Sequence, residues 1–233
     1  MSAHAFGLLG AALSMSIAWP QVYLSCVRRR TGGLSPAACL LAVAMPAGWL
    51  TYGLLIGDRI QVVSAVLNVT AGLAVLAALL VTQAAVRSLR VLRAGAGVAG
   101  AVLLAVCAAA TAAALPQVTA AHAGAMLGAV LPVGSLMSAL PQPLALLRDR
   151  ACDVSGLSPA RFRLAVASAT SWLLYGIATG QAAVGASALV SLVSALTVCL
   201  ALAARRPAAA YPEIAPPQWR ASVVTRSLAV TGI

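Results

Sequence analysis

The chain has 233 residues, of which 62% are hydrophobic and only 8% are charged, with a mean hydropathy of +0.99. A soluble domain carries about 45–50% apolar and about 25% charged residues, so this composition excludes a soluble globular protein and favours one immersed in a lipid bilayer. A net charge of +11 would suggest a nucleic-acid partner in a soluble protein. Here the charges lie between apolar blocks, so we interpret them as signals of membrane orientation and expect no nucleic-acid partner.

Seven apolar segments approach or exceed the length of about 20 helical residues that a hydrocarbon core of about 30 Å requires. They cover residues 5–27, 37–57, 60–82, 95–115, 124–147, 164–180 and 182–204. The connections between them are short, and no strand-like alternation competes with the helical interpretation. The sequence therefore predicts an all-α, polytopic membrane protein with seven transmembrane helices.

The arginines predict the orientation of these helices. All 15 basic residues are arginines, and an outside N-terminus places 14 of them on the inner side, with only Arg59 outside. This asymmetry is the one that the positive-inside rule describes. The first segment has no positive charge before it and three arginines after it, the reverse of a cleavable signal peptide. We expect an outside N-terminus and a cytosolic C-terminus, in a bacterial plasma membrane.

The chemistry-bearing residues are sparse. The five cysteines stand apart from one another, and the four acidic residues and two histidines form no acid/base pair or metal-ligand spacing. We therefore expect no enzyme activity, no metal and no cofactor. The tail from Pro207 contains four prolines, which favours a disordered cytosolic extension over residues 207–233.

An internal repeat is the most informative feature of the sequence. Residues 33–57 and 156–180 match at 14 of 25 positions at a constant offset of 123, including a shared GLSP, a Trp and a Tyr-Gly pair. A Pro-Gln pair stands upstream of each copy, at Pro20-Gln21 and Pro141-Gln142. Each unit therefore contains three helices, and the fourth segment between them restores the same orientation in the second unit.

The paired Pro-Gln helices, the two GLSP loops and the W-x-x-Y-G stretches resemble the PQ-loop superfamily, and within it the SWEET-type sugar transporters and their half-size SemiSWEET relatives. The resemblance implies a 3+1+3 arrangement of parallel repeats over residues 5–204. It divides the chain into a first repeat (1–86), a linker with the fourth helix (87–122), a second repeat (123–206) and the tail.

Helical rise places two Trp residues and two polar residues at one depth. Trp49 lies eight residues before Gly57, and Asn68 lies eight residues after Ile60, so both are about 12 Å below the same surface. The offset of 123 maps this pair onto Trp172 and Ser191. A Trp face can stack against a sugar ring, while amides and hydroxyls can bond its hydroxyl groups. The four residues are similar to the family's substrate pocket, although Ser191 replaces the expected Asn.

The resemblance also implies moving parts. Proline in a helix interior removes a backbone hydrogen bond, and the family's Pro-Gln motifs act as hinges of an inner gate, here Pro20, Gln21, Pro141 and Gln142. Tyr52 and Asp58 match residues of the outer gate in the half-size relatives. Tyr175 repeats Tyr52, whereas Gln181 stands where a second Asp would be, which predicts an asymmetric gate.

Together these features favour facilitative transport of mono- or disaccharides by alternating access. Asp58 is the only acidic residue beside the predicted pathway, so we expect a uniporter without proton or sodium coupling. Two alternatives stay open: a PQ-loop carrier for amino acids or another metabolite, and a membrane receptor or assembly factor of the same architecture. The expected partners are a small-molecule substrate and the lipid bilayer, and a homo-oligomer is a further option.

Overall fold

The computed structural model describes residues 2–31, 34, 36–83, 89–148 and 159–204, and its regular elements are all helical within those ranges. The predicted tail 207–233, Gly33 and Ser35 of the first GLSP loop, and residues 156–158 of the second lie outside the described residues. The elements are α1 (Ala3–Val22), η1 (Tyr23–Val27), α2 (Pro36–Ile56), α3 (Arg59–Thr82), α4 (Leu89–Ala113), α5 (Ala120–Ala139), α6 (Pro141–Arg148), α7 (Pro159–Thr179) and α8 (Ala182–Ala204).

The predicted segments correspond to these helices, with one correction. Residues 124–147 were expected to form one helix around Pro141, but α5 ends at Ala139 and Pro141 is the first residue of α6. Proline has no N–H to bond the carbonyl four residues back, whereas it fits the first turn of a new helix well. The α4 and α7 helices also begin earlier than predicted, at Leu89 and Pro159.

Local sequence explains how the helices begin and turn. Asp58 caps α3, since its Oδ1 accepts hydrogen bonds from the backbone N–H of Ile60 (3.0 Å) and Gln61 (3.1 Å). Gly57 and Gly180, at equivalent positions of the repeat, form the α2–α3 and α7–α8 turns with φ of 73° and 69°. Only glycine adopts this left-handed conformation readily, so the same turn chemistry closes both helix pairs.

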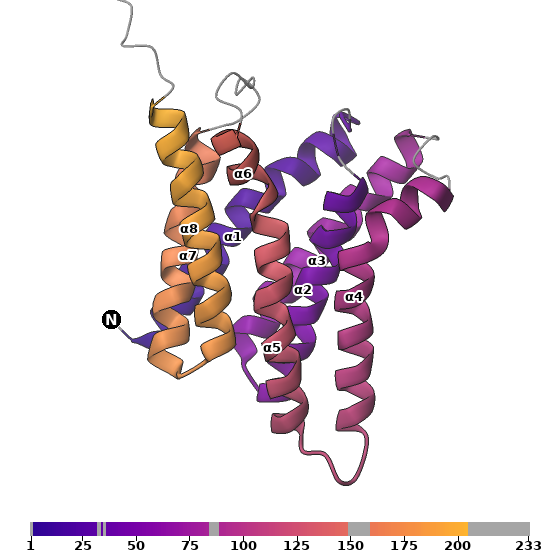
Figure 1. Ribbon diagram of the computed structural model, residues 1–233, viewed down its shortest axis with the longest axis vertical. Helices are drawn as coiled ribbons and strands as arrows, with labels where there is room; N and C mark the ends of the chain where they lie inside the picture. The colour runs from indigo at the N-terminus through magenta and orange to yellow at the C-terminus, as the bar shows by residue number, and fades with distance from the viewer. Residues whose placement is uncertain (1, 32–33, 35, 84–88, 149–158, 205–233) are drawn as a thin grey trace, which may run out of the picture.

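Each unit follows the same packing order. In the first unit α1 lies against α3 and α3 against α2, while in the second α5 lies against α8 and α8 against α7. The units meet where α1 packs on α7 and where α5 packs on α2, and α4 packs on α2 and α5. Figure 1 shows the helices alongside one another, with the α7–α8 turn at the same end of the bundle as the N-terminus.

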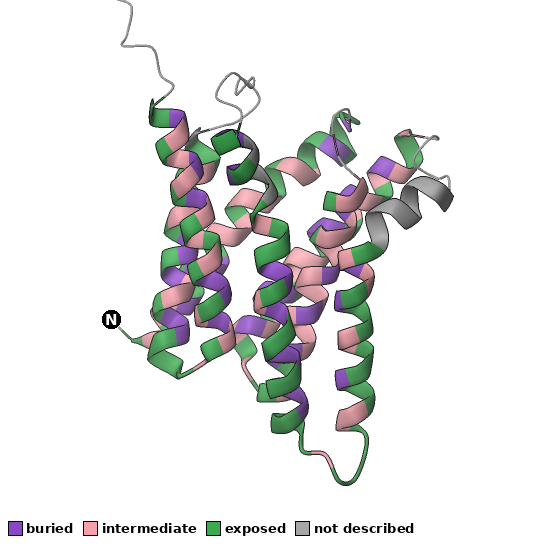
Figure 2. Cartoon of the chain, viewed as in Figure 1, coloured by how far each residue is buried: buried purple, intermediate pink, exposed green. Residues whose placement is uncertain are grey.

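The exposed surface of the bundle is apolar. Buried residues follow the faces that meet inside, while outward faces expose large hydrophobic side chains such as Leu104 (72%), Leu200 (70%) and Ile177 (68%) (Figure 2). Several serines and Gln61 are buried instead. This inversion is typical of a protein solvated by lipid, in which water does not cover the outer surface.

Within the described residues, five helices are long and apolar enough to cross a membrane: α1 with η1, α2, α3, α5 and α8. In α4, residues Gly97–Ala113 form a shorter apolar helix. The α7 helix is not among the five because Arg163 and several hydroxyl side chains lower its hydropathy. Those hydroxyls contribute to the interior of the bundle, as described below.

The core differs between the two ends of the bundle. We call the end that carries the turns at Gly57 and Gly180 the Asp58 end, and the opposite end the arginine end. The largest apolar cluster draws on both units and on α4, and includes Tyr52, Leu127 and Tyr175. Toward the arginine end each unit has its own smaller cluster. These clusters are Cys39, Val75 and Leu79 in the first unit, and Leu146, Val198 and Leu202 in the second.

Candidate functional site: a cavity between the two units

A cavity of about 310 Å³ lies between the units, lined by residues of α1, α2 and α3 and of α5, α7 and α8. All four residues predicted for the pocket, Trp49, Asn68, Trp172 and Ser191, line it. None of the described residues that line this cavity is charged. Its volume is at the lower end of the range of about 300–1,000 Å³ that is usual for small-molecule sites.

The third helix of each unit presents an equivalent stripe to the cavity. Spacings of three, four and seven residues place four side chains on one helical face. On α3 these are Gln61, Ser64, Ala65 and Asn68, and on α8 they are Val184, Ser187, Ala188 and Ser191. The repeat offset of 123 relates every pair, but the α3 stripe carries two amides and the α8 stripe carries none.

The Trp residues are held alike by a tyrosine three residues further along the same helix. The rings of Trp49 and Tyr52 have centroids 5.6 Å apart and an interplanar angle of 85°, and those of Trp172 and Tyr175 are 5.6 Å apart at 81°. Such edge-to-face pairs are a favourable aromatic geometry. Gly128 and Gly7 face Tyr52 and Tyr175, where a Cβ would lie within about 3 Å of the ring.

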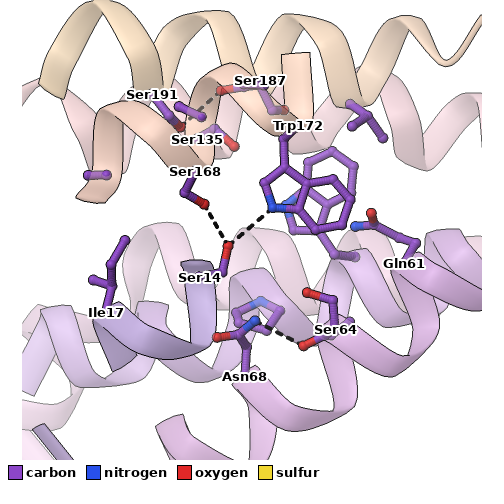
Figure 3. Close-up of a pocket in the computed structure, with 17 residues that line it drawn as sticks. Ser14, Ile17, Gln61, Ser64, Asn68, Ser135, Ser168, Trp172, Ser187 and Ser191 are labelled. Carbon is purple, nitrogen blue, oxygen red and sulfur yellow. Dashed lines mark hydrogen bonds between the residues drawn. The ribbon is translucent and has the colours of Figure 1, made fainter. Parts of the chain in front are cut away.

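Trp172 is also fixed by hydrogen bonds from the other unit (Figure 3). Its Nε1 donates to Ser14 Oγ at 3.1 Å, and Ser14 Oγ donates to the Gly10 carbonyl at 2.9 Å. Ser168 Oγ lies 2.9 Å from Ser14 Oγ and 3.3 Å from the same carbonyl. A Cβ on Gly10 would come within 3.0 Å of Trp172 Nε1, so the glycine permits this close approach.

The two polar residues predicted for the pocket both bond their own helix. Asn68 Nδ2 donates to the Ser64 carbonyl, and Ser191 Oγ donates to the Ser187 carbonyl, each at 2.9 Å. Asn68 keeps a second N–H and its carbonyl oxygen for another partner. Ser191 uses its one hydroxyl proton in this bond, so it can only accept from a molecule in the cavity.

At the Asp58 end, one carboxylate joins the two units. Asp58 Oδ2 accepts from Tyr175 Oη at 2.6 Å and from Gln181 Nε2 at 2.8 Å, while its other oxygen caps α3. Tyr52, which we predicted beside them, is buried but makes no hydrogen bond with the described residues. Asp58, Tyr175 and Gln181 line a second cavity of about 420 Å³ at this end, and none of them lines the first.

The two Pro-Gln pairs differ in structure. Pro20 lies inside α1, and the chain after it continues as the π-helix Tyr23–Val27, a rare geometry that often occurs at functional sites. Gln21 Nε2 donates to the buried Ser25 Oγ at 2.9 Å. Pro141 and Gln142 open α6, and their side chains lie outside the described residues.

Sequence reasoning missed several residues of the cavity. Gln61 could have been found because it lies seven residues before Asn68, on the same helical face. Ser14 and Ser168 could not, because many intramembrane serines were equally compatible with the pattern. Their alignment with Trp172 depends on how α1 packs against α7.

The comparisons with known proteins agree with this architecture. Residues 3–62 match the family model of the PQ loop repeat. The fold is similar to the 3.7 Å structure of a eukaryotic SWEET transporter, with a TM-score of 0.66 and 14% identity over 87% of this chain and 95% of that one. No curated protein sequence matches the chain.

These findings define a class of protein. It is an integral membrane protein with the fold of a SWEET transporter, in which α1 to α3 and α5 to α8 form the two units of a 3+1+3 plan and α4 lies between them in the chain. Residues 3–62 of its first unit match a PQ-loop repeat, so the PQ-loop resemblance of this unit and the SWEET-like fold predicted from the sequence are confirmed.

Proposed function

We propose that this protein is a facilitative carrier of neutral sugars that works by alternating access. The observation that carries the proposal is the cavity between the units: two Trp side chains, amides and hydroxyls line it, and no described lining residue is charged. Such a lining is complementary to a neutral molecule that is rich in hydroxyl groups. The fold similarity to a SWEET transporter supports the same function.

Charge favours a sugar over an amino acid. A zwitterionic substrate would leave water for a site with no opposite charge, and an unpaired buried charge is costly. The nearest acidic group along α3, Asp58, is engaged by Tyr175 and Gln181 and lines the other cavity. The volume of about 310 Å³ equals roughly ten waters in the liquid, which suits one sugar ring better than two.

The contrast between the two ends supports alternating access. Hydrogen bonds through Asp58 join the units at the Asp58 end, where Tyr52 and Tyr175 of the shared apolar cluster also lie. Each unit has a separate cluster toward the arginine end. We infer a conformation closed at the Asp58 end, which the positive-inside rule assigns to the outer side, with the N-terminus outside a bacterial plasma membrane. Bending at Pro20 and Pro141 would change access from the arginine end.

The absence of a carboxylate from the described lining argues for an uncoupled mechanism, since ion coupling requires a group that changes charge within the pathway. The carrier should therefore equilibrate its substrate and not accumulate it. Intramembrane catalysis would require groups that this lining does not supply.

Uptake into proteoliposomes tests the proposal. A panel of labelled mono- and disaccharides and amino acids is offered with and without a proton or sodium gradient, with protein-free liposomes as the control. We expect a monosaccharide to equilibrate at the same final level in every gradient. Uptake of amino acids but of no sugar would show that the protein is an amino-acid carrier instead. Accumulation of the substrate above its external concentration would refute uncoupled transport. A failure to move any solute would favour a receptor or assembly factor.

A further inference from the structure

Two buried polar atoms on the cavity wall lack a hydrogen-bond partner. Gln61 is 7% exposed and its Oε1 is unbonded, and Ser187 is 6% exposed and its Oγ is unbonded, among the described residues. More than nine-tenths of buried polar groups in proteins are hydrogen-bonded, so such an atom requires an explanation. A third such atom, Gln181 Oε1, belongs to the Asp58 network and lines the other cavity.

Gln61 and Ser187 belong to one site although they come from different units. Both line the cavity that contains Trp49 and Trp172, and Figure 3 shows Gln61 extending from α3 on the side of Trp172. Gln61 is seven residues before Asn68, which places it about 10 Å closer to the Asp58 end along the helix. The two residues therefore lie in the part of the cavity between the predicted pocket and the Asp58 network.

The repeat shows that the fold does not require an amide at this position. Val184 occupies the position in α8 that Gln61 occupies in α3, with the same neighbours at spacings of three and four residues. An apolar side chain therefore completes the same helical face in the second unit. The unbonded Oε1 of Gln61 should destabilise the empty protein and is explained best by a ligand that donates a hydrogen bond to it.

We propose that Gln61 and Ser187 recognise substrate hydroxyl groups at the Asp58 side of the cavity, and that Gln61 determines which hydroxyl is required. This inference rests on the proposed sugar transport. A carboxamide offers one acceptor and donors, and a serine hydroxyl offers both, so the pair matches groups that donate and accept at once. Asn68 and Ser191 then contact the opposite part of the sugar, toward the arginine end.

The first experiment separates recognition from structure. Gln61→Met keeps the length of the side chain and removes its polar atoms, and Ser187→Ala removes one hydroxyl. Each purified variant should melt at the same temperature as the wild type or higher when empty, because an unpaired buried group is lost. Each should also bind D-glucose about three- to tenfold more weakly, the usual effect of losing one neutral hydrogen bond.

The second experiment identifies the hydroxyl. The affinities of wild type and Gln61→Met are compared for D-glucose and each of its monodeoxy derivatives. In the wild type, removal of the hydroxyl that Gln61 bonds should weaken binding, and in Gln61→Met that one penalty should disappear while the others remain. Gln117→Met, in the exposed loop after α4, and Thr197→Val, at a half-buried position of α8 that does not line the cavity, are matched controls that should change neither affinity nor selectivity.

The outcomes distinguish this inference from the proposed function. Wild-type binding of glucose with unchanged affinities in both variants would overturn the inference and leave sugar transport intact. A lower melting temperature together with equal weakening of every derivative would assign Gln61 to packing, which also overturns it. Failure of the wild type to bind glucose or any sugar of the uptake panel would refute both.

Discussion

The two three-helix units share several backbone and aromatic features but differ in the polar groups that they present to the cavity. Both have a positive-φ glycine turn, an edge-to-face Trp–Tyr pair with centroids 5.6 Å apart, and a polar side chain bonded to the carbonyl four residues before it. These features set the helix geometry. Some of the residues that differ between the units, by contrast, face the cavity or the Asp58 network.

The clearest difference lies where the units meet. Asp58 and Gln181 occupy equivalent positions of the repeat, and they bond each other at 2.8 Å. Equivalent residues can touch only near the axis that relates the two units, so this pair lies close to that axis. Two aspartates there would repel unless one took up a proton, whereas an amide donates to the carboxylate. Divergence of the units therefore turns a repulsive position into a stabilising contact.

The cavity divides its polar groups in the same way. The α3 stripe holds Gln61 and Asn68 where α8 holds Val184 and Ser191. Trp172 in turn is bonded to Ser14 of the first unit, whereas Trp49 makes no hydrogen bond with the described residues. A sugar in this cavity would meet amides from the first unit and a hydrogen-bonded indole from the second, which predicts one preferred orientation. The following predictions test this division.

Removal of Trp172 should have the largest effect. Trp172→Ala deletes a cavity face and removes the indole donor to Ser14 Oγ, so sugar uptake should fall by more than about tenfold. Trp49→Ala should also lower uptake strongly, while Trp172→Phe keeps a ring and should lose less. Initial uptake rates in proteoliposomes at equal protein amounts measure this. Near-normal rates in both alanine variants would refute the pocket assignment.

Placing an aspartate at both equivalent positions, 58 and 181, should weaken the contact between the units at the Asp58 end. Gln181→Asp places two carboxylates together, and their repulsion favours separation of the units at this end. The population of the separated state should rise about tenfold for each 1.4 kcal/mol of repulsion. A cysteine in place of Ser64, in a background without other cysteines, should then react several-fold faster with an impermeant thiol reagent added at that end. Gln117→Asp, a new carboxylate on the exposed loop after α4, is the control. Equal labelling rates of the Ser64 cysteine with Gln181→Asp and with Gln117→Asp would contradict a gate at Asp58.

Exchanging the amide of the first unit for a serine should have a smaller effect. Asn68→Ser makes the two stripes alike at this position and should weaken apparent affinity about three- to tenfold, since the N–H donor that Asn68 keeps free is lost. Ser191→Ala should change it less, because the Ser191 proton is bonded to the Ser187 carbonyl. The KM for uptake of each variant measures the difference. A larger loss in Ser191→Ala than in Asn68→Ser would reverse the roles given to the two units.

Much of this arrangement could be predicted from the sequence. The length of the apolar blocks predicts the helices, and helical rise with the repeat offset predicts that Trp49, Asn68, Trp172 and Ser191 share a depth. Both arguments depend only on spacing along the chain. Such arguments do not require knowledge of how each helix is rotated about its own axis.

The remaining features depend on that rotation and on contacts between units. The apolar helices have no polar face that shows which side is buried, so Ser14 and Ser168 could not be separated from the other serines. Gln181 was recognised as a departure from the repeat, but its bond to Asp58 requires the packing of the two units. Pro141 was compatible with a kink or with a helix end, and the structure has the end.

Substitution of Pro20 should have the smallest effect and should change only the rate of exchange between conformations. Pro20→Ala restores an N–H that can bond the Ser16 carbonyl, which removes the cause of irregularity before the π-helix Tyr23–Val27 and stiffens α1. Since Pro20 does not line the cavity, the equilibrium affinity for sugar should stay unchanged while the exchange between states slows about two- to fivefold, the range expected if the barrier rises by less than about 1 kcal/mol.

The control is Pro132→Ala, which also restores a hydrogen bond inside a helix, in α5, at a position that does not line the cavity. Binding of labelled sugar to purified protein and its initial uptake rate, measured side by side, separate affinity from exchange. A fall in affinity at an unchanged rate would assign Pro20 to the binding site. An equal slowing in Pro132→Ala would mean that any stiffer helix slows the carrier, and that the hinge is not confined to the Pro-Gln position of the first unit.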